Sequence, residues 1–550
     1  MQRLNRTSPS LHLLLIVLIF AMAFIGYVAI IWSGQVHGYN ASKTVAARDL
    51  ALFAPLLAIF FWLTRKQRFR GEMILLTAAI FLFAVGQLMQ YRLFSDPEYG
   101  ARSERSEIRQ AKAQAVRMLN VQTGYDEDKK KILFPNGEMP KKTELPQLPV
   151  YERTLGDILT SVNTYIPLAA LAALVIAFRL FKDDKTLLWF QSHALLIGIA
   201  TLIPFAILAF MSEEGKFLGQ TTPWEGVKIF FMLSFAGMLA DTYHHLRRTR
   251  WGLPPARYFL PFLLVAAMPV IPFFALSDFG QMLVFFGVYV MLYIVAVRKK
   301  AQMVYALAVV GLLFALFSGT SLVVGLFSAD KKPATAFGVP ARVHFRFYQW
   351  VHTWEPPPPD TWWWNRDYKR YLQAKGLPEP TYPQEIKRRN LDAWSDKVLQ
   401  QSQGLFGVNE GGVIGQGLGL GFPETVPISD SDFIYAAIAE ETGLGGSLAL
   451  LIVLGVFVFA GTAISIGAPD MFTKLLAAGF TAFIGFQALV NIGGVLRLLP
   501  MTGITLPFVS HGGWSLITSF AMLGILLAFS HRNAIARPVI EPKSEFVPVR

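Results

Sequence analysis

Residues 11–32 read LHLLLIVLIFAMAFIGYVAIIW, a run in which no side chain carries a formal charge. A helix rises about 1.5 Å per residue, so such a run covers the roughly 30 Å hydrocarbon layer of a bilayer. Comparable apolar runs follow near 49–64, 73–94, 161–181, 186–211, 224–243, 258–276, 280–297, 302–326, 433–460, 472–497 and 503–530. The sequence therefore predicts an all-α, polytopic membrane protein with about twelve transmembrane helices.

The composition agrees with this fold class. Of the 550 residues 53% are hydrophobic and only 16% are charged, whereas soluble domains are about a quarter charged. The chain contains no cysteine, which excludes thiolate catalysis, cysteine-ligated metal centres and a disulfide scaffold. The first apolar run lacks a small-residue cleavage site and is expected to be a retained anchor.

The net charge of +13 is distributed as a topology signal. With the N-terminus in the cytoplasm, alternate turns should carry Lys and Arg, and the outer turns hold little beyond Lys43, Arg48 and Lys216. This pattern places both termini in the cytoplasm and argues against nucleic-acid binding. The expected cytoplasmic cations are Arg65, Lys66, Arg68, Arg70, Arg179, Lys182, Lys185, Arg247, Arg248, Arg250, Arg257, Arg298, Lys299, Lys300, Arg532, Arg537, Lys543 and Arg550.

Two segments between the spans are too long to be simple connections, and both are expected outside the cell. Long structured loops on one face commonly carry function. Residues 101–120 are expected to be helical, and a run of three tryptophans at 362–364 is either an interfacial aromatic belt or a surface for a sugar or partner. The predicted organisation is 1–94 (three helices), 95–158 (outer loop), 159–326 (six helices), 327–432 (large outer loop), 433–531 (three helices) and 532–550 (cytoplasmic tail).

Charged residues at the ends of the predicted spans indicate a polar site. Such residues are costly in lipid and usually face a cavity, although local ion pairs that stabilise helix packing are the alternative. Glu225 and Lys228 lie three residues apart, close enough to pair on one helix face. The others are Asp278, Asp432, Glu440, Glu441 and Arg497.

The stretch LLPMTGITLPFVSHGGWSL (498–516) is unusual for a membrane span. Its prolines and glycines interrupt helical hydrogen bonding, and non-helical backbone at membrane depth is tolerated where protein buries it or where it lines a cavity. Thr502, Ser510 and the freed amides are then suited to an anionic head group. A plain kinked hairpin is the alternative.

Several motifs together resemble one family. FQALVNIGGVLRLLPMTGITLPFVSHGGWSL (486–516) is similar to the closing motif of the SEDS proteins (shape, elongation, division and sporulation; FtsW/RodA/SpoVE), and PISDSDFIYAAIAEETG (427–443) resembles a second family motif. GGVIGQGLG (411–419), TPWEGVK (222–228) and SDFGQ (277–281) resemble three more. The resemblance implies a core of about ten helices, here extended by two, in the bacterial cytoplasmic (inner) membrane.

One segment of the large loop resembles the family's catalytic motif. NLDAWSDK (390–397) resembles it at Asp392, Trp394 and Asp396, with Ala393 and Lys397 in place of prolines. His511 likewise replaces a tyrosine of the closing motif. The resemblance implies that Asp396 is the essential carboxylate of a peptidoglycan glycosyltransferase that polymerises lipid II at the outer membrane face, in elongation or division. It also implies undecaprenyl-pyrophosphate-linked glycan and a class B penicillin-binding protein as partners.

In this chemistry Asp396 is expected to be the general base, with Trp394 packed over the site to lower its polarity. Lys228 and Arg497 are expected to stabilise the departing pyrophosphate, with Arg389 and Lys397 as alternatives. An ion pair of Arg497 with Glu440 or Glu441 is the competing interpretation. The full set of expected substrate-binding residues is Glu225, Lys228, Asp278, Trp394, Asp432, Gln487, Asn491, Arg497, Thr502 and Ser510.

No cofactor is required by the sequence. A divalent cation (Mg or Mn) shared by the pyrophosphate and Asp278 or Asp432 is compatible chemistry, but no compact metal motif supports it. The alternatives to the enzyme are a flippase for a lipid-linked precursor and a degenerate scaffold for a penicillin-binding protein. Another outer-face transferase, such as an O-antigen ligase, is disfavoured by the closing motif.

Overall fold

A computed structural model describes residues 8–36, 41–95, 161–211, 224–248, 278–298, 341–361, 364–378 and 382–536, together with a few isolated positions between them. The expected span 302–326 and the expected helix at 101–120 lie outside the described residues, as does most of 258–276. β1 (Tyr125–Asp126) and β2 (Lys131–Ile132) form a two-residue antiparallel pair, and every other described element is a helix.

The N-terminal helices form one side of the bundle. α1 (Pro9–Val36) packs against α4 (Ile74–Ser95), and between them the chain descends through α2 (Lys43–Ala51), α3 (Phe53–Phe61) and a π-helical turn, η1 (Trp62–Lys66). Ser42 caps α2 by accepting a hydrogen bond from the Val45 amide. The expected spans at 11–32, 49–64 and 73–94 correspond to these elements.

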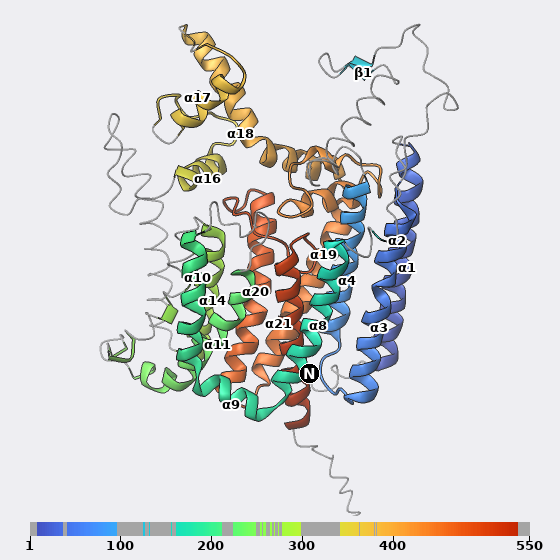
Figure 1. Ribbon diagram of the computed structural model, residues 1–550, viewed down its shortest axis with the longest axis vertical. Coiled ribbons are helices and arrows are strands. Elements are labelled where there is room, and N and C mark those ends of the chain that lie inside the picture. The colour runs from blue at the N-terminus through green and yellow to red at the C-terminus, as the bar shows by residue number, and fades with distance from the viewer. Residues whose placement is uncertain are drawn as a thin grey trace, which may run out of the picture.

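The middle of the chain supplies α8 (Val162–Lys182), α9 (Asp184–Ser192), α10 (Ala194–Met211), α11 (Trp224–Leu246) and α14 (Phe279–Val297). α9 and α10 replace the single span expected at 186–211, because the chain bends by 68° between them. Asp183 caps α9, which lies across the lower end of the bundle in Figure 1.

The C-terminal helices are α19 (Ile434–Ile466), α20 (Met471–Val495) and α21 (Gly513–Ala536). α19 is kinked at Gly443, whose φ of 64° is a conformation that suits glycine. The span expected at 503–530 begins later in the structure, since α21 starts at Gly513. Residues 500–505 have no regular structure and 507–511 turn or bend, as prolines and glycines at this spacing favour.

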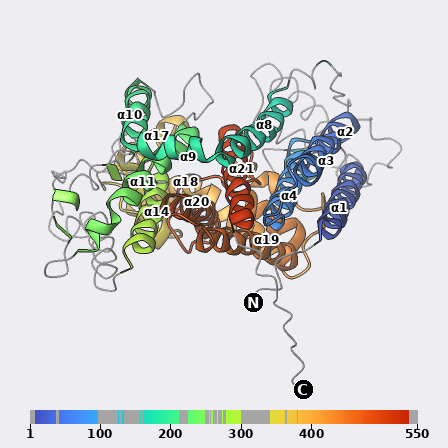
Figure 2. The ribbon, with the colours of Figure 1, turned by 90° about the horizontal axis from the view of Figure 1, so that it is seen from below.

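Eight of the described helices are long and apolar enough to cross a membrane, or nine if α9 and α10 count as one broken span. α11 carries Glu225, Lys228 and Asp241 and is not among the eight. The chain is thus a polytopic helical membrane protein. Viewed from below, α21 lies in the middle of the bundle, with α1–α4 on one side and α10, α11 and α14 on the other (Figure 2).

The large loop folds into three helices at one end of the bundle (Figure 1): α16 (Ala341–Val351), α17 (Asn365–Ala374) and α18 (Pro383–Gly411). We call this the outer end. Arg65, Arg179 and Arg298, in the expected cytoplasmic turns, lie at or beyond the opposite ends of their helices. The predicted sidedness is therefore consistent with the fold.

Candidate functional site

Glu225 and Lys228 lie in the first turns of α11 at the outer end, and both are buried. Their side chains form an ion pair within the helix, which confirms the pairing that their spacing indicated. Gln281 of α14 donates from Nε2 to Glu225 Oε1 at 2.8 Å, and Lys228 Nζ lies 5.7 Å from the centroid of the Phe483 ring. The ammonium group is thus held between a carboxylate and an aromatic face.

Asp278 and Asp432 approach the same short segment of chain. Asp278 caps α14 and accepts a hydrogen bond from the Gln281 amide at 3.2 Å. A methyl group at Gly503 would lie 3.5 Å from Asp432 Oδ2 and 3.6 Å from Nη2 of Arg346, which α16 supplies. Arg346 Nη1 also donates to the Thr502 carbonyl at 2.9 Å. Four distant parts of the sequence therefore meet around residues 502–504.

The electrostatics of the two carboxylates are unusual. Burial raises the pKa of Asp278 to about 6, and the nearby carboxylate of Glu225 acts in the same direction. Burial also raises the pKa of Asp432 to about 6, with Asp430 and Asp278 adding to the effect and Arg346 opposing it. Two acidic groups that change charge close to neutral pH are typical of functional sites.

Three of the expected substrate-binding residues instead hold the backbone of the site. Asn491 Nδ2 donates to the carbonyls of Asp432 and Ile504, at 2.9 and 2.6 Å. Gln487 Nε2 donates to the Thr505 carbonyl at 3.1 Å. Ser510 Oγ donates to the Ser431 carbonyl and accepts from the Leu506 amide. These bonds brace segment 502–510 against the turn before α19, and a substrate-binding role of the three residues stays a prediction.

Trp394 does not pack over this site. Its indole is 1% exposed and donates from Nε1 to the Thr353 carbonyl at 2.9 Å. It meets Trp364 edge to face, with ring centroids 5.3 Å apart, in a small core that Tyr368, Leu372 and Val398 complete. Both indoles fill the interior that joins α17 to α18, and a substrate contact of Trp394 stays a prediction.

Arg497 is bonded to the end of α16. Its side chain donates to the carbonyls of Trp350 and Val351, at 2.8 and 2.9 Å, and Trp350 Nε1 donates back to the Arg497 carbonyl at 3.1 Å. Neither the expected pyrophosphate contact nor the competing ion pair with Glu440 or Glu441 describes these bonds. Arg497 occupies the carbonyls at the end of α16, where a cation is electrostatically favoured.

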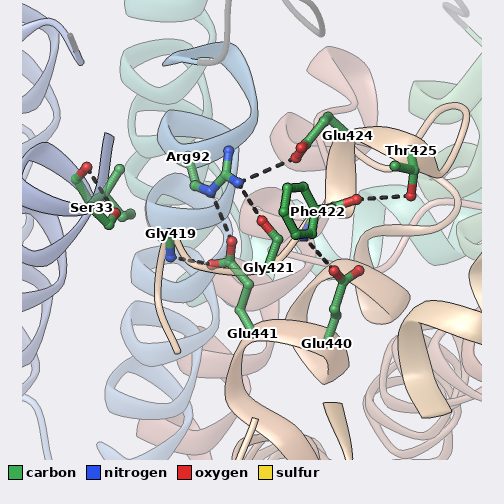
Figure 3. Close-up of polar contacts among 10 residues, drawn as sticks. Ser33, Arg92, Gly419, Gly421, Phe422, Glu424, Thr425, Glu440 and Glu441 are labelled. Atoms are coloured by element: carbon green, nitrogen blue, oxygen red, sulfur yellow. Dashed lines mark hydrogen bonds and ion pairs between the residues drawn. The ribbon is translucent and has the colours of Figure 1, made fainter. Parts of the chain in front are cut away.

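Glu440 and Glu441 belong to a separate buried cluster (Figure 3). Arg92 of α4 donates from Nε to Glu441 Oε1 at 2.9 Å and from Nη2 to the Gly421 carbonyl at 2.9 Å. Glu440 Oε1 accepts the Phe422 amide. The local ion pair considered as the alternative is thus confirmed for Glu441, and it joins α4 to the glycine-rich turn beside the kink of α19.

Asp396 lies on α18, and its side chain lies outside the described part. Asp392, one turn earlier on the helix, is exposed. The two loop cations named as alternatives are engaged elsewhere: Lys397 pairs with Asp367 at 3.1 Å, and Arg389 pairs with Glu385. Further down α18, Gln401 and Ser402 are buried where the helix reaches α19 and α20.

Two cations were missed from the sequence, one in the site and one in the separate cluster of Glu441. Arg346 lies in ARVHFRFYQW, which shows only the pattern of an amphipathic helix, and Arg92 is one cation near the end of a predicted span. The second carried a usable signal, because a buried arginine in a span requires a carboxylate partner. Within the described residues, no three His, Asp or Glu side chains could together hold a metal ion.

Residues 385–535 match the model of the FtsW/RodA/SpoVE family, which is described as cell cycle protein. Peptidoglycan glycosyltransferase RodA of Mycobacterium tuberculosis is 40% identical over 154 residues, 27% of this chain and 33% of that protein. Stage V sporulation protein E of Bacillus subtilis is 39% identical over 155 residues, 27% of this chain and 42% of that protein. The chain thus spans only a third to two-fifths of these relatives' length.

Two solved structures are similar over a larger part of the chain. The first comes from work on polymerization and crosslinking by a peptidoglycan synthase complex. Its TM-score is 0.48 at 20% identity, and the alignment covers 69% of this chain and 92% of the other chain. The other, the rod shape determining protein RodA of Thermus thermophilus, has a TM-score of 0.33 at 20% identity, with coverages of 68% and 97%.

Proposed function

We propose that this chain is a peptidoglycan glycosyltransferase, because residues 385–535 match the FtsW/RodA/SpoVE family model. It polymerises lipid II into glycan strands at the outer face of the bacterial cytoplasmic membrane, in elongation or division, together with a class B penicillin-binding protein. The observation that carries the proposal is the matched segment itself. It contains Asp396, Asp432 and the 498–516 stretch, and the Asp432 carboxylate lies at the outer end beside Gly503 of that stretch.

The reaction joins the acceptor hydroxyl to the anomeric carbon of a lipid-linked sugar. The new glycosidic bond forms as the bond from the anomeric carbon to the pyrophosphate oxygen breaks, and the pyrophosphate leaves with that electron pair. Asp396 takes the proton of the attacking hydroxyl as general base, a contribution of roughly 10²–10⁴-fold. Ionised Asp278 and Asp432 stabilise the positive charge that develops on the sugar ring.

The cations of the site have distinct tasks in this proposal. Lys228, held by Glu225 and the Phe483 ring, is the cation for the departing pyrophosphate. Arg497 acts indirectly by holding α16. A bound Mg or Mn ion would add positive charge at the pyrophosphate; two carboxylates are too few to hold it alone, so the substrate phosphates would complete its ligands.

The proposal is tested by lipid II polymerisation with the purified full chain, alone and with a candidate class B penicillin-binding protein. Asp396→Asn removes the base without changing the shape of the side chain, so the rate should fall by roughly 10²–10⁴-fold. Asp392→Asn, an exposed carboxylate one turn away on the same helix, is the matched control and should retain wild-type activity within a few-fold.

Two outcomes would overturn the enzyme. Transbilayer movement of labelled lipid II by the wild type and by Asp396→Asn, without polymer, would make the chain a flippase. Absence of polymer from the wild type with or without the partner, combined with stimulation of the partner's crosslinking, would make it a scaffold.

A further inference from the structure

The glycine-rich turn after α18, residues 412–420, exposes two neighbouring aliphatic side chains at the outer end. Val413 is 73% exposed and Ile414 is 89% exposed, the largest exposed fraction of any large hydrophobic residue in the described part of the chain. Single exposed apolar side chains are ordinary on protein surfaces. The meaning of this pair therefore depends on where the turn lies in the molecule.

Backbone hydrogen bonds fix the turn on α19. Two of its amides, those of Gln416 and Gly417, donate to carbonyls of α19 just before the kink, both at 2.9 Å. Two of its carbonyls, those of Gly412 and Val413, accept from amides just after the kink, at 2.9 and 3.4 Å. The exposed pair is thus held at the level where the straight inner part of α19 begins.

That inner part of α19 has the surface of a lipid-facing helix. Every exposed position from Leu444 to Ile466 holds an aliphatic or aromatic side chain, an alanine or a glycine. At 1.5 Å per residue the stretch is about 33 Å long, which matches the roughly 30 Å hydrocarbon layer of a bilayer. Leu444 therefore lies at the outer edge of this layer, and the exposed pair lies beside it.

α1 gives the same level independently. A methyl group at Gly419 would lie 3.4 Å from Ile30 Cα and would overlap the hydroxyl of Ser33, so the turn touches the last turns of α1. Trp32, in the same part of α1, is 73% exposed, and tryptophan favours the boundary between membrane and water. Two helices thus place the turn at the outer boundary of the bilayer.

The sequence of the turn suits this boundary. Residues 411–423 read GGVIGQGLGLGFP and contain no charged side chain, whereas Glu410 and Glu424 stand directly outside. Leu420 and Phe422 are exposed as well. An uncharged apolar turn that continues the lipid-facing surface of α19 matches acyl chains better than it matches water.

We propose that the turn 412–420 is an interfacial membrane anchor, in which Val413 and Ile414 insert into the outer leaflet where headgroups meet acyl chains. The turn follows α18 directly, so insertion fixes that end of α18 at the membrane surface, while its opposite end lies away from the bundle (Figure 1). The inference goes beyond the proposed function and holds whether or not the chain forms polymer.

The test uses a nitroxide label on a single cysteine, because the full chain contains no other. Ile414→Cys is labelled and reconstituted in vesicles of phosphatidylcholine and phosphatidylglycerol. Its relaxation is measured with oxygen, which concentrates in acyl chains, and with a nickel chelate, which stays in water. Tyr382→Cys is the aqueous control at the other end of α18 and Phe459→Cys the lipid control on α19; both positions have similar exposure, 74% and 77%.

We expect the oxygen-to-nickel ratio at Ile414 to exceed that at Tyr382 several-fold and to remain below that at Phe459, because the turn lies at the edge of the bilayer and Phe459 lies inside it. Val413→Cys should repeat the result. A fluorophore on Ile414→Cys should also be quenched by lipids with brominated acyl chains, and one on Tyr382→Cys should not.

Two results would overturn the inference. Nickel access at Ile414 equal to that at Tyr382 would place the turn in water. Low access of both reagents at Ile414, together with absence of quenching by brominated lipid, would show that protein covers the turn, either another segment of this chain or a second copy.

Discussion

The surroundings of Asp432 disfavour the ionised form of its carboxyl group. Burial and the neighbouring Asp430 and Asp278 raise its pKa to about 6, above the ordinary value near 4. The folded state then binds a proton more tightly than the unfolded state between about pH 4 and 6. The contribution of Asp432 to stability is therefore greatest below this window and falls as the pH rises through it.

This predicts that Asp432→Asn stabilises the protein while impairing catalysis. Above pH 6 the neutral amide avoids the cost of the buried charge, and we expect a gain on the order of 1 kcal/mol. The gain should vanish near pH 4, where wild-type Asp432 is itself protonated. Thermal melting in detergent at pH 4 and pH 7.5 checks this; an equal difference between the two proteins at both values contradicts it.

α4 and the 506–511 turn are in close contact at Gly86 of α4. A methyl group there would lie 2.3 Å from the Val509 carbonyl oxygen and 2.7 Å from Val509 Cα. Both atoms belong to the backbone, so no side-chain rotation relieves the contact. Gln90, one turn later on α4, donates to the same carbonyl at 3.1 Å, and the close approach is thus part of how the site is held.

Gly86→Ala is expected to destabilise the protein by about 1–3 kcal/mol, the usual cost of overpacking. Gly455→Ala is the control, because nothing lies within 4 Å of a methyl group at that position of α19. Alanine there should be neutral or slightly stabilising. Melting temperatures of the two variants measure the contrast, and equal values for both would show that the 506–511 turn moves aside.

Prediction from sequence succeeded where length and apolar character decide the structure, as for α1, α4, α8 and α20. It failed where distant segments compete for the same side chain. Trp394 resembled a site residue but fills the core with Trp364, and Arg497 has the charge for pyrophosphate but is committed to α16. No residue adjacent to Arg346 in the sequence indicates that Arg346 lies near Asp432. Asp278 and Asp432 were predicted as site residues because a charged carboxylate at the end of a membrane span is energetically costly unless it faces a polar cavity or a partner.

At the scale of the whole molecule, Arg92 joins the N-terminal helices to the family-like segment. It is fully buried, and its bonds reach Glu441 and the Gly421 carbonyl. Removal of one partner of a buried ion pair leaves the other charge uncompensated, at a cost of about 3–5 kcal/mol. Together with the close approach of α4 to the 506–511 turn at Gly86, this side chain connects the two parts of the bundle.

Arg92→Met should lower the unfolding free energy by about this amount, and the additional change Glu441→Gln should recover much of it. Melting of the single and double variants in nanodiscs checks the expectation. A double variant no more stable than Arg92→Met would show that the bonds of Arg92 to Gly421 and Glu424, rather than its ion pair with Glu441, carry the energy.

α18 has a further consequence for the molecule as a whole. It is one continuous helix from Pro383 to Gly411, and at 1.5 Å per residue its length along the chain is about 42 Å. Its outer part packs on α17 through the two indoles, and its other end adjoins the glycine-rich turn against the kink of α19. A displacement of the outer part therefore travels through one element to that turn, and the backbone of Asp396 lies between the two ends.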